Sequence, residues 1–381
     1  MTTPRLVIRN FAQIAEADLT FGDLTVLVGA QGTGKSLALQ WLKVAIDGKE
    51  ICAALGAAGH PTDKPQVLLD LIFGTGMGAA WNATETSVSF DGKKLVPRTI
   101  PKAGGAEPSL FFVPAHRSML ISDGWASPFQ RLTADTPVVA RLFSQNLFDR
   151  FSTRGEGDLF PLDRVLKKAY RERIDDAVFH GGHVAIEEDR QHAKRLRLTH
   201  GEVHLPFMTW TAGQREFTPL LLGLYHLLPS RKTLKHDAID WVVIEEPEMG
   251  LHPQAISVVM LLVLDLLWRG YRVVLSTHSP DVLTAVWALQ RLRENDARWQ
   301  LVCDAFGVPS RHMRTVAQAA LQKEYRVHLM AFGDDGRVRS QDISTLDPGD
   351  ENDAVSGWGG LTEFSSRFGD AVRAAVRESG A

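Results

Sequence analysis

The 381 residues of the chain are enough for one large hydrophobic core, or for a main domain that carries an inserted one. Hydrophobic residues make up 44% of the sequence and charged residues 23%, proportions typical of a soluble globular protein rather than a disordered chain. The formal net charge of −3 gives no overall electrostatic reason to expect nucleic acid, so DNA binding would require a local basic patch.

Three short strands are predicted before residue 30. Apolar residues at positions 6, 8, 11 and 14 indicate a first strand and a turn, and those at 17, 19 and 21 indicate a second strand. Residues 24–28 form a third, mostly apolar strand. This strand leads directly into a glycine-rich segment, and apolar residues at helical spacing follow from Leu37 onward.

The glycine-rich segment reads GAQGTGKS over residues 29–36, which matches the phosphate-binding pattern G-x-x-x-x-G-K-S between a strand and a helix. Its glycines let successive backbone N–H groups turn toward phosphate, and the following helix adds the positive end of its dipole. Lys35 is expected to reach the β- and γ-phosphates, and Ser36 to ligate Mg²⁺. The residues predicted to bind the nucleotide here are Gly29, Gln31, Gly32, Thr33, Gly34, Lys35 and Ser36.

The signals between residues 50 and 120 are short. An apolar run occupies residues 67–73. Asp91-Gly92 separates two strand-like segments and predicts a β-hairpin, because Asp-Gly suits a tight turn with two positive φ angles. Residues 110–113 are a short apolar strand that ends in Pro114-Ala115-His116-Arg117.

Residues 121–204 are predicted to be an insertion in the nucleotide-binding domain. Apolar residues recur at helical spacing over 138–151 and 162–174, and residues 184–188, 195–199 and 202–205 indicate the strands of a meander. We therefore divide the chain into a first part of the core (1–120), a helical and meander insertion that would form a lid or arm (121–204), and a second part of the core with a carboxy-terminal extension (205–381).

A parallel α/β pattern returns after residue 205. The predicted buried strands are 239–245 and 272–276, and the predicted helices are 217–228, 253–268 and 280–291. This alternation is typical of a mainly parallel sheet covered on both faces. Residues 256–268 are almost wholly apolar, but they are too few for a bilayer span and include Asp265, so we predict a buried helix. A helix over 313–323, a hairpin of 325–332 and 337–342, and an amphipathic helix over 361–377 complete the chain.

Two acidic residues and a histidine follow the buried strands. Glu245 and Glu246 end the first strand, and His278 follows the second. Because ligands of open α/β sheets bind at the carboxyl ends of parallel strands, Glu245 is expected to support Mg²⁺ and Glu246 to polarise the attacking water. His278 is expected to contact a γ-phosphate. We predict Glu246 and His278 as catalytic residues, and Ser36 with Glu245 as the metal site.

The segment WTAGQRE, residues 210–216, stands before an apolar helix. The hydroxyl of Thr211 and the backbone N–H groups of Ala212 and Gly213 would form a second phosphate-binding surface at the start of that helix. A chain needs only one phosphate-binding surface to hold its own nucleotide, so the second surface is available for the nucleotide of another copy. Thr211, Ala212, Gly213 and Gln214 are therefore predicted to contact the nucleotide held by another copy.

Together these four motifs resemble those of the ABC-type ATPases, and within them the soluble SMC-, RecF- and OLD-like group. The opening LVIRNFAQIAEADLTFGDLTVLVGAQGTGKS looks like the amino-terminal signature of this group, and WTAGQRE looks like a degenerate LSGGQ signature. IEEPEMGLHP resembles the second phosphate-site motif with its D-loop, and LSTHSP resembles the switch-histidine segment.

The resemblance implies an α/β P-loop NTPase with an ABC-ATPase head architecture, in which a mainly parallel sheet carries an antiparallel amino-terminal subsheet and a helical insertion. It also implies ATP and Mg²⁺ as cofactors, slow regulatory ATP hydrolysis, and a homodimer in which two chains enclose the nucleotides head to tail.

The sequence departs from the family pattern at several positions. Trp210 and Ala212 replace the Leu and Gly of the signature, although Thr211 keeps a hydroxyl that would reach a γ-phosphate. Gln130 is a candidate for the Q-loop glutamine. Arg117 lies where this group often has a P-x-x-R stretch, and two roles stay open for it: phosphate sensing or interface formation, and a structural ion pair.

Two further features receive structural interpretations. Acidic residues interleave with a basic set, so we interpret it as a solvated mixed-charge face rather than a DNA contact; the set is Arg164, Lys167, Lys168, Arg171, Arg195 and Arg197. Gly333-Asp334-Asp335-Gly336 stands between two strand patterns, so a hairpin turn is preferred to the acidic metal pair of a Toprim nuclease domain.

The expected location of the protein is the cytoplasm. The two cysteines, Cys52 and Cys303, have no ligand-like spacing, which argues against a disulfide scaffold and a zinc site. The first eleven residues contain no apolar run that could serve as a signal peptide.

Three functions are compatible with the motifs. We favour an ATPase whose ATP-gated dimer, or higher oligomer, controls a separately encoded effector such as a nuclease in bacterial antiviral defence or a toxin–antitoxin pair, because the sequence shows no effector domain. The second is a RecF-like ATPase that clamps DNA in repair or recombination. The third, a transporter subunit at a membrane, is disfavoured by the RecF-like amino terminus and the long carboxy-terminal extension.

Overall fold

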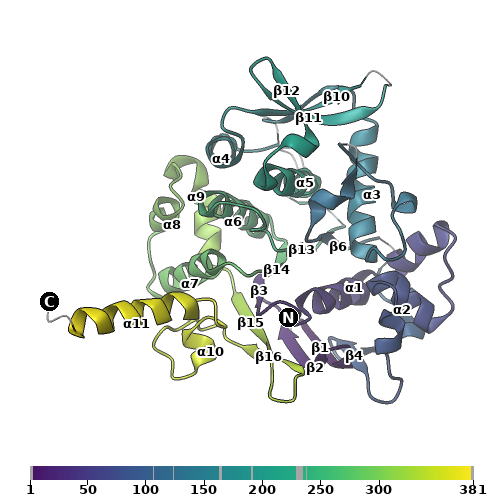
Figure 1. The fold of residues 1–381 in the computed structure, drawn as a ribbon, viewed down its shortest axis with the longest axis horizontal. Helices are drawn as coiled ribbons and strands as arrows, with labels where there is room; N and C mark the ends of the chain where they lie inside the picture. Colours follow the sequence, from purple (N-terminus) through teal and green to yellow (C-terminus); the bar gives the residue numbers. More distant parts are fainter. Residues whose placement is uncertain are drawn as a thin grey trace.

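In the computed structural model, which describes residues 3–105, 107–122, 124–162, 165–189, 192–228, 235–236 and 238–378, the chain is built around one ten-stranded mixed sheet. The strand order is β5-β4-β1-β2-β16-β15-β3-β14-β13-β6 (Figure 1). The expected mainly parallel sheet with an antiparallel amino-terminal part is confirmed.

The parallel half of the sheet carries the glycine-rich segment. Its strands, all parallel to one another, are β15 (Tyr325–Phe332), β3 (Leu24–Val28), β14 (Arg272–Ser276), β13 (Trp241–Glu245) and β6 (Leu110–Val113). The carboxyl ends of parallel neighbours lie at one edge of a sheet, where open α/β folds bind ligands. The strand arrangement therefore places the segments that follow β3, β13 and β14 together.

The antiparallel half consists of β1 (Arg5–Phe11), β2 (Ile14–Thr20), β4 (Ser87–Phe90) and β5 (Lys93–Leu95). The hairpin predicted at Asp91-Gly92 is confirmed, because β4 pairs with β5 and the two residues have φ angles of 48° and 76°. β16 (Val338–Asp342) pairs antiparallel with β15 and parallel with β2, so this second hairpin joins the two halves.

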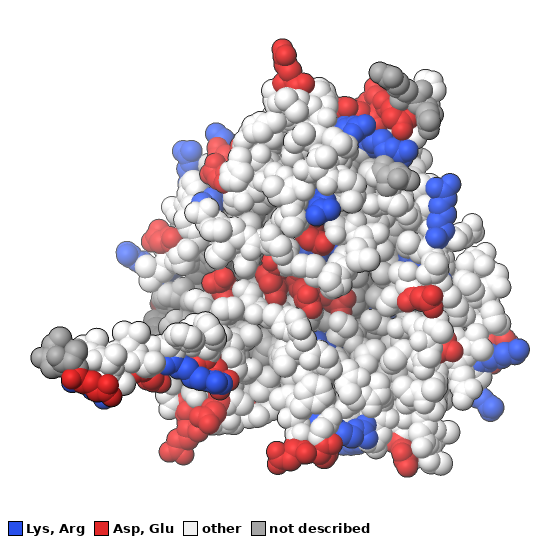
Figure 2. Space-filling view, viewed as in Figure 1, with Lys and Arg blue, Asp and Glu red and all other residues white. Residues whose placement is uncertain are grey.

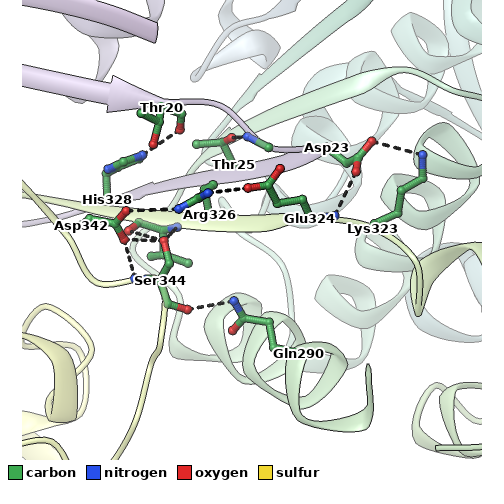
Figure 3. Close-up of polar contacts among 12 residues, drawn as sticks. Thr20, Asp23, Thr25, Gln290, Lys323, Glu324, Arg326, His328, Asp342 and Ser344 are labelled. Atoms are coloured by element: carbon green, nitrogen blue, oxygen red, sulfur yellow. Dashed lines mark hydrogen bonds and ion pairs between the residues drawn. The ribbon is translucent and has the colours of Figure 1, made fainter. Parts of the chain in front are cut away.

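Polar contacts also hold β15 beside β3 (Figure 3). Asp23 accepts a hydrogen bond from the backbone N–H of Glu324 at 2.9 Å and pairs with Lys323 at 3.2 Å. The ring of His328, which is 1% exposed, lies 2.8 Å from the backbone oxygen of Thr20. Burial lowers the pKa of His328, so its neutral form is favoured inside the sheet.

Helices cover both faces of the sheet. α1 (Lys35–Ala57) and α2 (Pro65–Phe73) pack with the antiparallel half in one hydrophobic cluster, which Val243 joins from β13. α5 (Ala212–Leu227), α6 (Pro253–Trp268) and α7 (Pro280–Glu294) pack in a second cluster, which Val242 and Ile244 join from the same strand. Successive side chains of a strand point to opposite faces, so residues 241–244 of β13 are all apolar, and only its last residue, Glu245, is charged.

The predicted core helix over residues 253–268 is confirmed as α6, and nearly all of its side chains are buried. Among the described residues, no helix has both the length and the apolar character needed to cross a membrane.

Residues 121–204 contain more strand than the periodicity indicated. A four-stranded sheet is formed by β9 (Gly157–Phe160), β10 (His183–Glu188), β11 (Lys194–His200) and β12 (Val203–Pro206), and β7 (Ile121–Ser122) pairs with β8 (Trp125–Ala126). The predicted helix over 138–151 is α3 (Val138–Ser152), which packs against β6 and α5. The division of the chain at residues 120 and 204 stays a prediction.

The helix predicted over 162–174 was too long. α4 spans only Lys168–Ile174, and a π-helical turn, η5 (Asp175–Phe179), continues it. β9 ends at Phe160, and the helix begins only after its N-cap residue, Lys167. The helical spacing of the apolar residues therefore extends further toward the amino terminus than the helix itself.

The carboxy-terminal part contains α8 (Gln300–Ala305), which was not predicted, α9 (Ser310–Ala320), α10 (Asp353–Ser356) and α11 (Glu363–Glu378). α11 has no buried residue and projects from the body of the molecule (Figure 1). The hairpin turn predicted at residues 333–336 is confirmed, and Asp335 pairs with Arg339 at 2.6 Å. No cluster of three metal-ligating side chains occurs among the described residues.

The short helices of the described chain connect these elements. They are the 3₁₀ helices η1 (Met77–Ala80), η2 (Pro97–Lys102), η3 (Arg117–Leu120), η4 (Phe129–Arg131) and η6 (Phe207–Thr209).

A buried ion pair fixes α1 against the start of β6. Asp47 has non-helical dihedral angles inside α1 (φ −131°, ψ 28°), and its carboxylate accepts hydrogen bonds from the N–H groups of Ser109 at 2.8 Å and Leu110 at 2.9 Å. The same carboxylate pairs with Lys43 at 2.7 Å. The interruption of α1 therefore has a structural partner in the sheet.

We expect Asp47→Ala to lower the free energy of unfolding by about 3–5 kcal/mol, because the buried Lys43 ammonium would lose its principal partner. Glu50→Ala is the matched control: its carboxylate also pairs with Lys43, at 2.9 Å, but is 31% exposed, and it should cost less than about 1 kcal/mol. Urea denaturation of both variants measures the difference. Equal losses would show that Asp47 does not have this role.

Candidate active site

The segment of residues 29–36 forms a loop between β3 and α1. Gly29, Gly32 and Gly34 have φ angles of 145°, 77° and 79°, which are values that glycine adopts without strain. A Cβ atom on Gly29 would lie 2.1 Å from the backbone oxygen of Met330 on β15, so this position has no room for a side chain. The loop therefore has the winding that directs backbone N–H groups inward.

The loop is held by its own side chains and by the β1–β2 turn. The Lys35 ammonium donates to the backbone oxygens of Gly29 at 2.8 Å and Ala30 at 2.9 Å, and the Thr33 hydroxyl donates to Ala30 at 2.8 Å. The Gln13 amide donates to the oxygen of Gly32 at 2.9 Å. Gln31, Gly32 and Ser36 are exposed, so a phosphate chain can reach the loop from solvent.

Glu245 lies at the carboxyl end of β13 and is 4% exposed. Burial raises the pKa of its carboxyl group, whereas hydrogen bonds from the Ser36 hydroxyl and from the backbone N–H of Ala115, at 3.2 Å, lower it. Its second oxygen, Oε1, is buried without a hydrogen-bond partner. A buried oxygen without a partner, beside a hydroxyl, suits a hard cation that also takes phosphate and water ligands, so Ser36 and Glu245 fit the expected Mg²⁺.

Glu246 is the next residue and faces His278. The His278 Nε2 atom lies 3.6 Å from Glu246 Oε1, and both side chains are about one third exposed, at 30% and 31%. Burial, and then the charge of Lys35, lower the pKa of His278, so its neutral form is favoured. A partly exposed carboxylate beside a neutral imidazole can orient a water molecule and accept a proton from it.

The backbone of Glu246 is in the left-handed region, with φ at 40°. Its N–H donates to the backbone oxygen of Ser276, the last residue of β14, at 2.9 Å. A non-glycine residue with this conformation costs roughly 1–3 kcal/mol and is maintained only where the surroundings require it. The adjoining strands thus determine the direction in which the Glu246 side chain points after the end of β13.

Glu248 is a site residue that the sequence reasoning missed. Its Oε1 atom accepts hydrogen bonds from the Thr277 hydroxyl at 2.8 Å and from the backbone N–H of His278 at 2.6 Å. It therefore fixes the segment that carries the histidine. The acidic motif EEPE contains the signal, but the spacing does not show that its third carboxylate turns back toward the next strand.

The signature segment begins α5. Thr211 is the N-cap residue: its hydroxyl accepts from the N–H of Gln214 at 3.3 Å, and the Gln214 amide oxygen accepts from the N–H of Thr211 at 3.2 Å. Gln214 also donates to the backbone oxygen of Val178 at 3.1 Å. Thr211 and Ala212 are exposed, whereas Trp210 is buried and packs on Phe207. Trp210 is thus a core residue at its signature position.

Gly213 brings the signature helix against the segment after Glu246. A Cβ atom on Gly213 would lie 2.8 Å from the backbone oxygen of Gly250, so a larger residue would force the two segments apart. Among the described residues, the side chains of Thr211 and Gln214 form hydrogen bonds with each other's backbone and with Val178, and none of these bonds reaches the loop at residues 29–36. No described hydrogen bond of these two residues therefore joins the two predicted phosphate-binding surfaces within one chain.

Arg117 is completely buried, and Gln130 is exposed in η4. The Arg117 guanidinium donates to backbone oxygens, including that of Glu245 at 3.1 Å and that of Glu216 at 3.0 Å. Neither a surface role nor a simple ion pair describes this arrangement. The assignment of Gln130 as the Q-loop residue stays a prediction.

Acidic side chains gather near the middle of one face of the molecule, over the region of β13 and β14 (Figure 2). Lys and Arg are sparse in that central area, and a small group of them lies toward the upper right of the view (Figure 2). Burial lowers the pKa of Lys35, and the charges of Glu246, Glu248 and Glu245 oppose that shift. These carboxylates would repel the phosphates of a nucleotide, and a divalent cation would offset that repulsion.

The fold and the glycine-rich loop between β3 and α1 are those of an α/β P-loop nucleotide-binding domain. Residues 159–284, about a third of the chain, match the family model described as "AAA domain, putative AbiEii toxin, Type IV TA system". The matched segment contains the signature, the strand-end carboxylates and His278. Over this segment the chain is accordingly similar to AAA-type ATP-binding proteins.

Several solved structures are similar to this chain. An Smc head bound to the C-winged helix domain of ScpA has a TM-score of 0.43 at 12% identity, with 89% of this chain and 96% of that chain covered. The SMC head domain from Thermotoga maritima has a TM-score of 0.39 at 12% identity, with 90% and 99% covered. An Smc head domain with an extended coiled coil, bound to the C-terminal domain of ScpA derived from Pyrococcus furiosus, has a TM-score of 0.40 at 10% identity, with 89% and 96% covered. No curated protein matches the sequence.

We expect Glu248→Ala to lower kcat for ATP hydrolysis by about 10- to 100-fold, because His278 would lose the contact that fixes its backbone. ATP binding should change by less than about threefold, since the loop at residues 29–36 is untouched. Steady-state kinetics and binding of a fluorescent ATP analogue separate the two effects.

Glu248→Gln keeps an amide oxygen that can accept the same hydrogen bonds, so we expect it to retain most of the activity. If the two variants lose activity equally, Glu248 acts through its charge and not by holding the histidine segment.

Proposed function

We propose that this ATPase is a molecular switch in which ATP joins two copies of the chain head to tail and thereby controls a separately encoded effector. Each copy would hold ATP and Mg²⁺ with residues 29–36 and Glu245, and would offer Thr211–Gln214 to the nucleotide of the other copy. The supporting observation is the exposed, capped start of α5, which has the form of a phosphate-binding surface, while the described hydrogen bonds of Thr211 and Gln214 do not reach the phosphate loop of the same chain.

Hydrolysis would control the lifetime of this dimer. Glu246 would accept a proton from the attacking water, and His278 would contact the γ-phosphate. Contacts between the signature and the γ-phosphate exist only before hydrolysis. Because a ligand shifts an equilibrium only by its differential affinity for the two states, loss of the γ-phosphate would release the partner copy. Slow hydrolysis would suit a regulatory role.

The control of an effector rests on the family match. The matching family model carries a toxin–antitoxin description, and such systems pair two gene products.

Direct action on DNA, the RecF-like alternative, receives less support, because the face over β13 and β14 is acidic (Figure 2). The basic set of residues 164–197 also has acidic partners: Lys167 pairs with Asp265 at 2.8 Å, and Arg195 pairs with Asp189 at 3.3 Å. Arg164 lies outside the described residues.

We expect Glu246→Gln to be a stable dimer in the presence of ATP and Mg²⁺, and a monomer with ADP, because the variant binds ATP but cannot activate water. Multi-angle light scattering after size exclusion measures this directly. Lys35→Ala in the same background is the control and should stay monomeric with either nucleotide. A Glu246→Gln protein that is monomeric with ATP and Mg²⁺ would overturn the switch.

The target of the switch is tested with the same variant. Co-purification of the ATP-bound dimer with the product of a neighbouring gene would support control of an effector. ATP-dependent, salt-sensitive binding of the dimer to duplex DNA, without such a protein, would support the RecF-like alternative instead.

A further inference from the structure

Arg117 connects three separate segments at the centre of the molecule. The residue begins η3, directly after β6, and its side chain has no exposed surface. Its Nη1 atom donates to the backbone oxygens of Pro114 at 3.2 Å and Glu245 at 3.1 Å, and its Nε atom donates to that of Glu216 at 3.0 Å. The planar guanidinium thus spans β6, the end of β13 and the first turns of α5.

The same guanidinium reaches Glu246. Its Nη2 atom lies 3.4 Å from the backbone oxygen of Glu246, which also accepts from the N–H of Met249 at 3.1 Å. Since Glu246 has the unfavourable φ of 40°, contacts to its carbonyl group help to maintain that conformation. Arg117 therefore contributes to the direction of the carboxylate expected to activate water, although it does not contact the water site itself.

A second contact joins η3 to the signature helix. The Ser118 hydroxyl is hydrogen-bonded to the Glu216 carboxylate, while Arg117 is bonded to the backbone oxygen of the same residue. Glu216 lies four residues after Ala212, the first residue of α5, and therefore one helical turn from the exposed start of the helix. A shift of η3 would consequently move the surface that Thr211 and Ala212 present.

The buried guanidinium of Arg117 also interacts electrostatically with several carboxylates. The charges of Glu216, Glu248, Glu245 and Glu246 favour its protonated form, although burial has the larger effect and lowers its pKa. Binding of a cation and a nucleotide at Glu245 would change the charge around this guanidinium. The contacts of Arg117 then provide a direct route from that change to α5.

We propose that Arg117 is a positioning residue that couples the strand-end carboxylates to the signature helix, so that the presence of nucleotide in one chain sets the surface offered to the other copy. This inference rests on the proposed function, and it assigns to Arg117 neither a contact with phosphate nor a place at the dimer interface. Arg117 acts through backbone carbonyl groups, and a lysine, with one ammonium group, cannot span Glu216 and Glu246 together.

The test compares Arg117→Lys with the unmodified residue in the Glu246→Gln background. The charge is retained, so binding of a fluorescent ATP analogue by the monomer should change by less than about threefold. ATP-dependent dimerisation, measured by sedimentation across protein concentrations, should weaken by at least about tenfold. With Glu246 restored, kcat per nucleotide-binding site, counted by ATP-analogue binding so that unfolded protein is excluded, should fall about tenfold or more while KM changes little, as expected for loss of an interaction made in the transition state.

Arg141→Met is the matched control. Arg141 is a second completely buried arginine, in α3, whose Nη2 atom donates to the backbone oxygen of Leu71 at 2.8 Å. This variant should lower thermal stability but leave ATP-dependent dimerisation within about threefold of the parent. If it weakens dimerisation as much as Arg117→Lys does, coupling by Arg117 is contradicted.

Ser118→Ala tests the same connection without altering a buried charge. It removes one of the two bonds from η3 to Glu216, and we expect dimerisation to weaken by about threefold to fivefold. If Arg117→Lys does not fold, this variant alone decides: parental dimerisation in Ser118→Ala would overturn the inference. Failure of Glu246→Gln itself to dimerise would contradict the proposed function, whereas a dimer that tolerates both substitutions would contradict only the role of Arg117.

Discussion

Parallel pairing of β3, β14 and β13 is the constraint on which the site depends. Ser276 on β14 is paired with Leu27 on one side and with Glu245 on the other. The pairing continues beyond the strands, since the N–H of Thr277 donates to Leu27 at 3.0 Å and that of Glu246 donates to Ser276 at 2.9 Å. Three segments far apart in the sequence consequently leave the sheet at adjacent positions.

The charged side chains at the carboxyl edge of these parallel strands suit a charged ligand. Three carboxylates and one lysine meet there, and one oxygen of Glu245 is buried without a partner. In the described structure, Lys35 donates to the carbonyl groups of its own loop. A nucleotide with its cation would exchange these contacts for stronger, charge-assisted ones, so the geometry is suited to binding before any partner copy is considered.

The β15–β16 hairpin has a less obvious part in this arrangement. β15 lies beside β3 and supplies the Met330 oxygen that leaves no room for a side chain at Gly29. β16 then extends the sheet to the antiparallel strands, whose turn places Gln13 against the phosphate loop. The carboxy-terminal part of the chain thus supports the amino-terminal motif, and the nucleotide loop is enclosed by segments from both.

Local patterns in the sequence determined much of this protein. A glycine-rich segment between an apolar strand and a helix, and the buried strands that end in Glu245 and Ser276, are visible without a structure because each depends on neighbouring residues. The hairpins at Asp91-Gly92 and at residues 333–336 are visible for the same reason. Patterns of this kind suffice for the fold class and for the expected nucleotide.

Only the tertiary structure decided the features that depend on long-range pairing. Glu248 was missed because its carboxylate accepts hydrogen bonds from Thr277 and His278, which are distant in the sequence. Arg117 is the clearest case: the sequence left its role open, since its hydrogen bonds to the described residues go to backbone carbonyl groups, and backbone groups are the same at every residue. Which carbonyl groups lie within reach is a property of the fold alone.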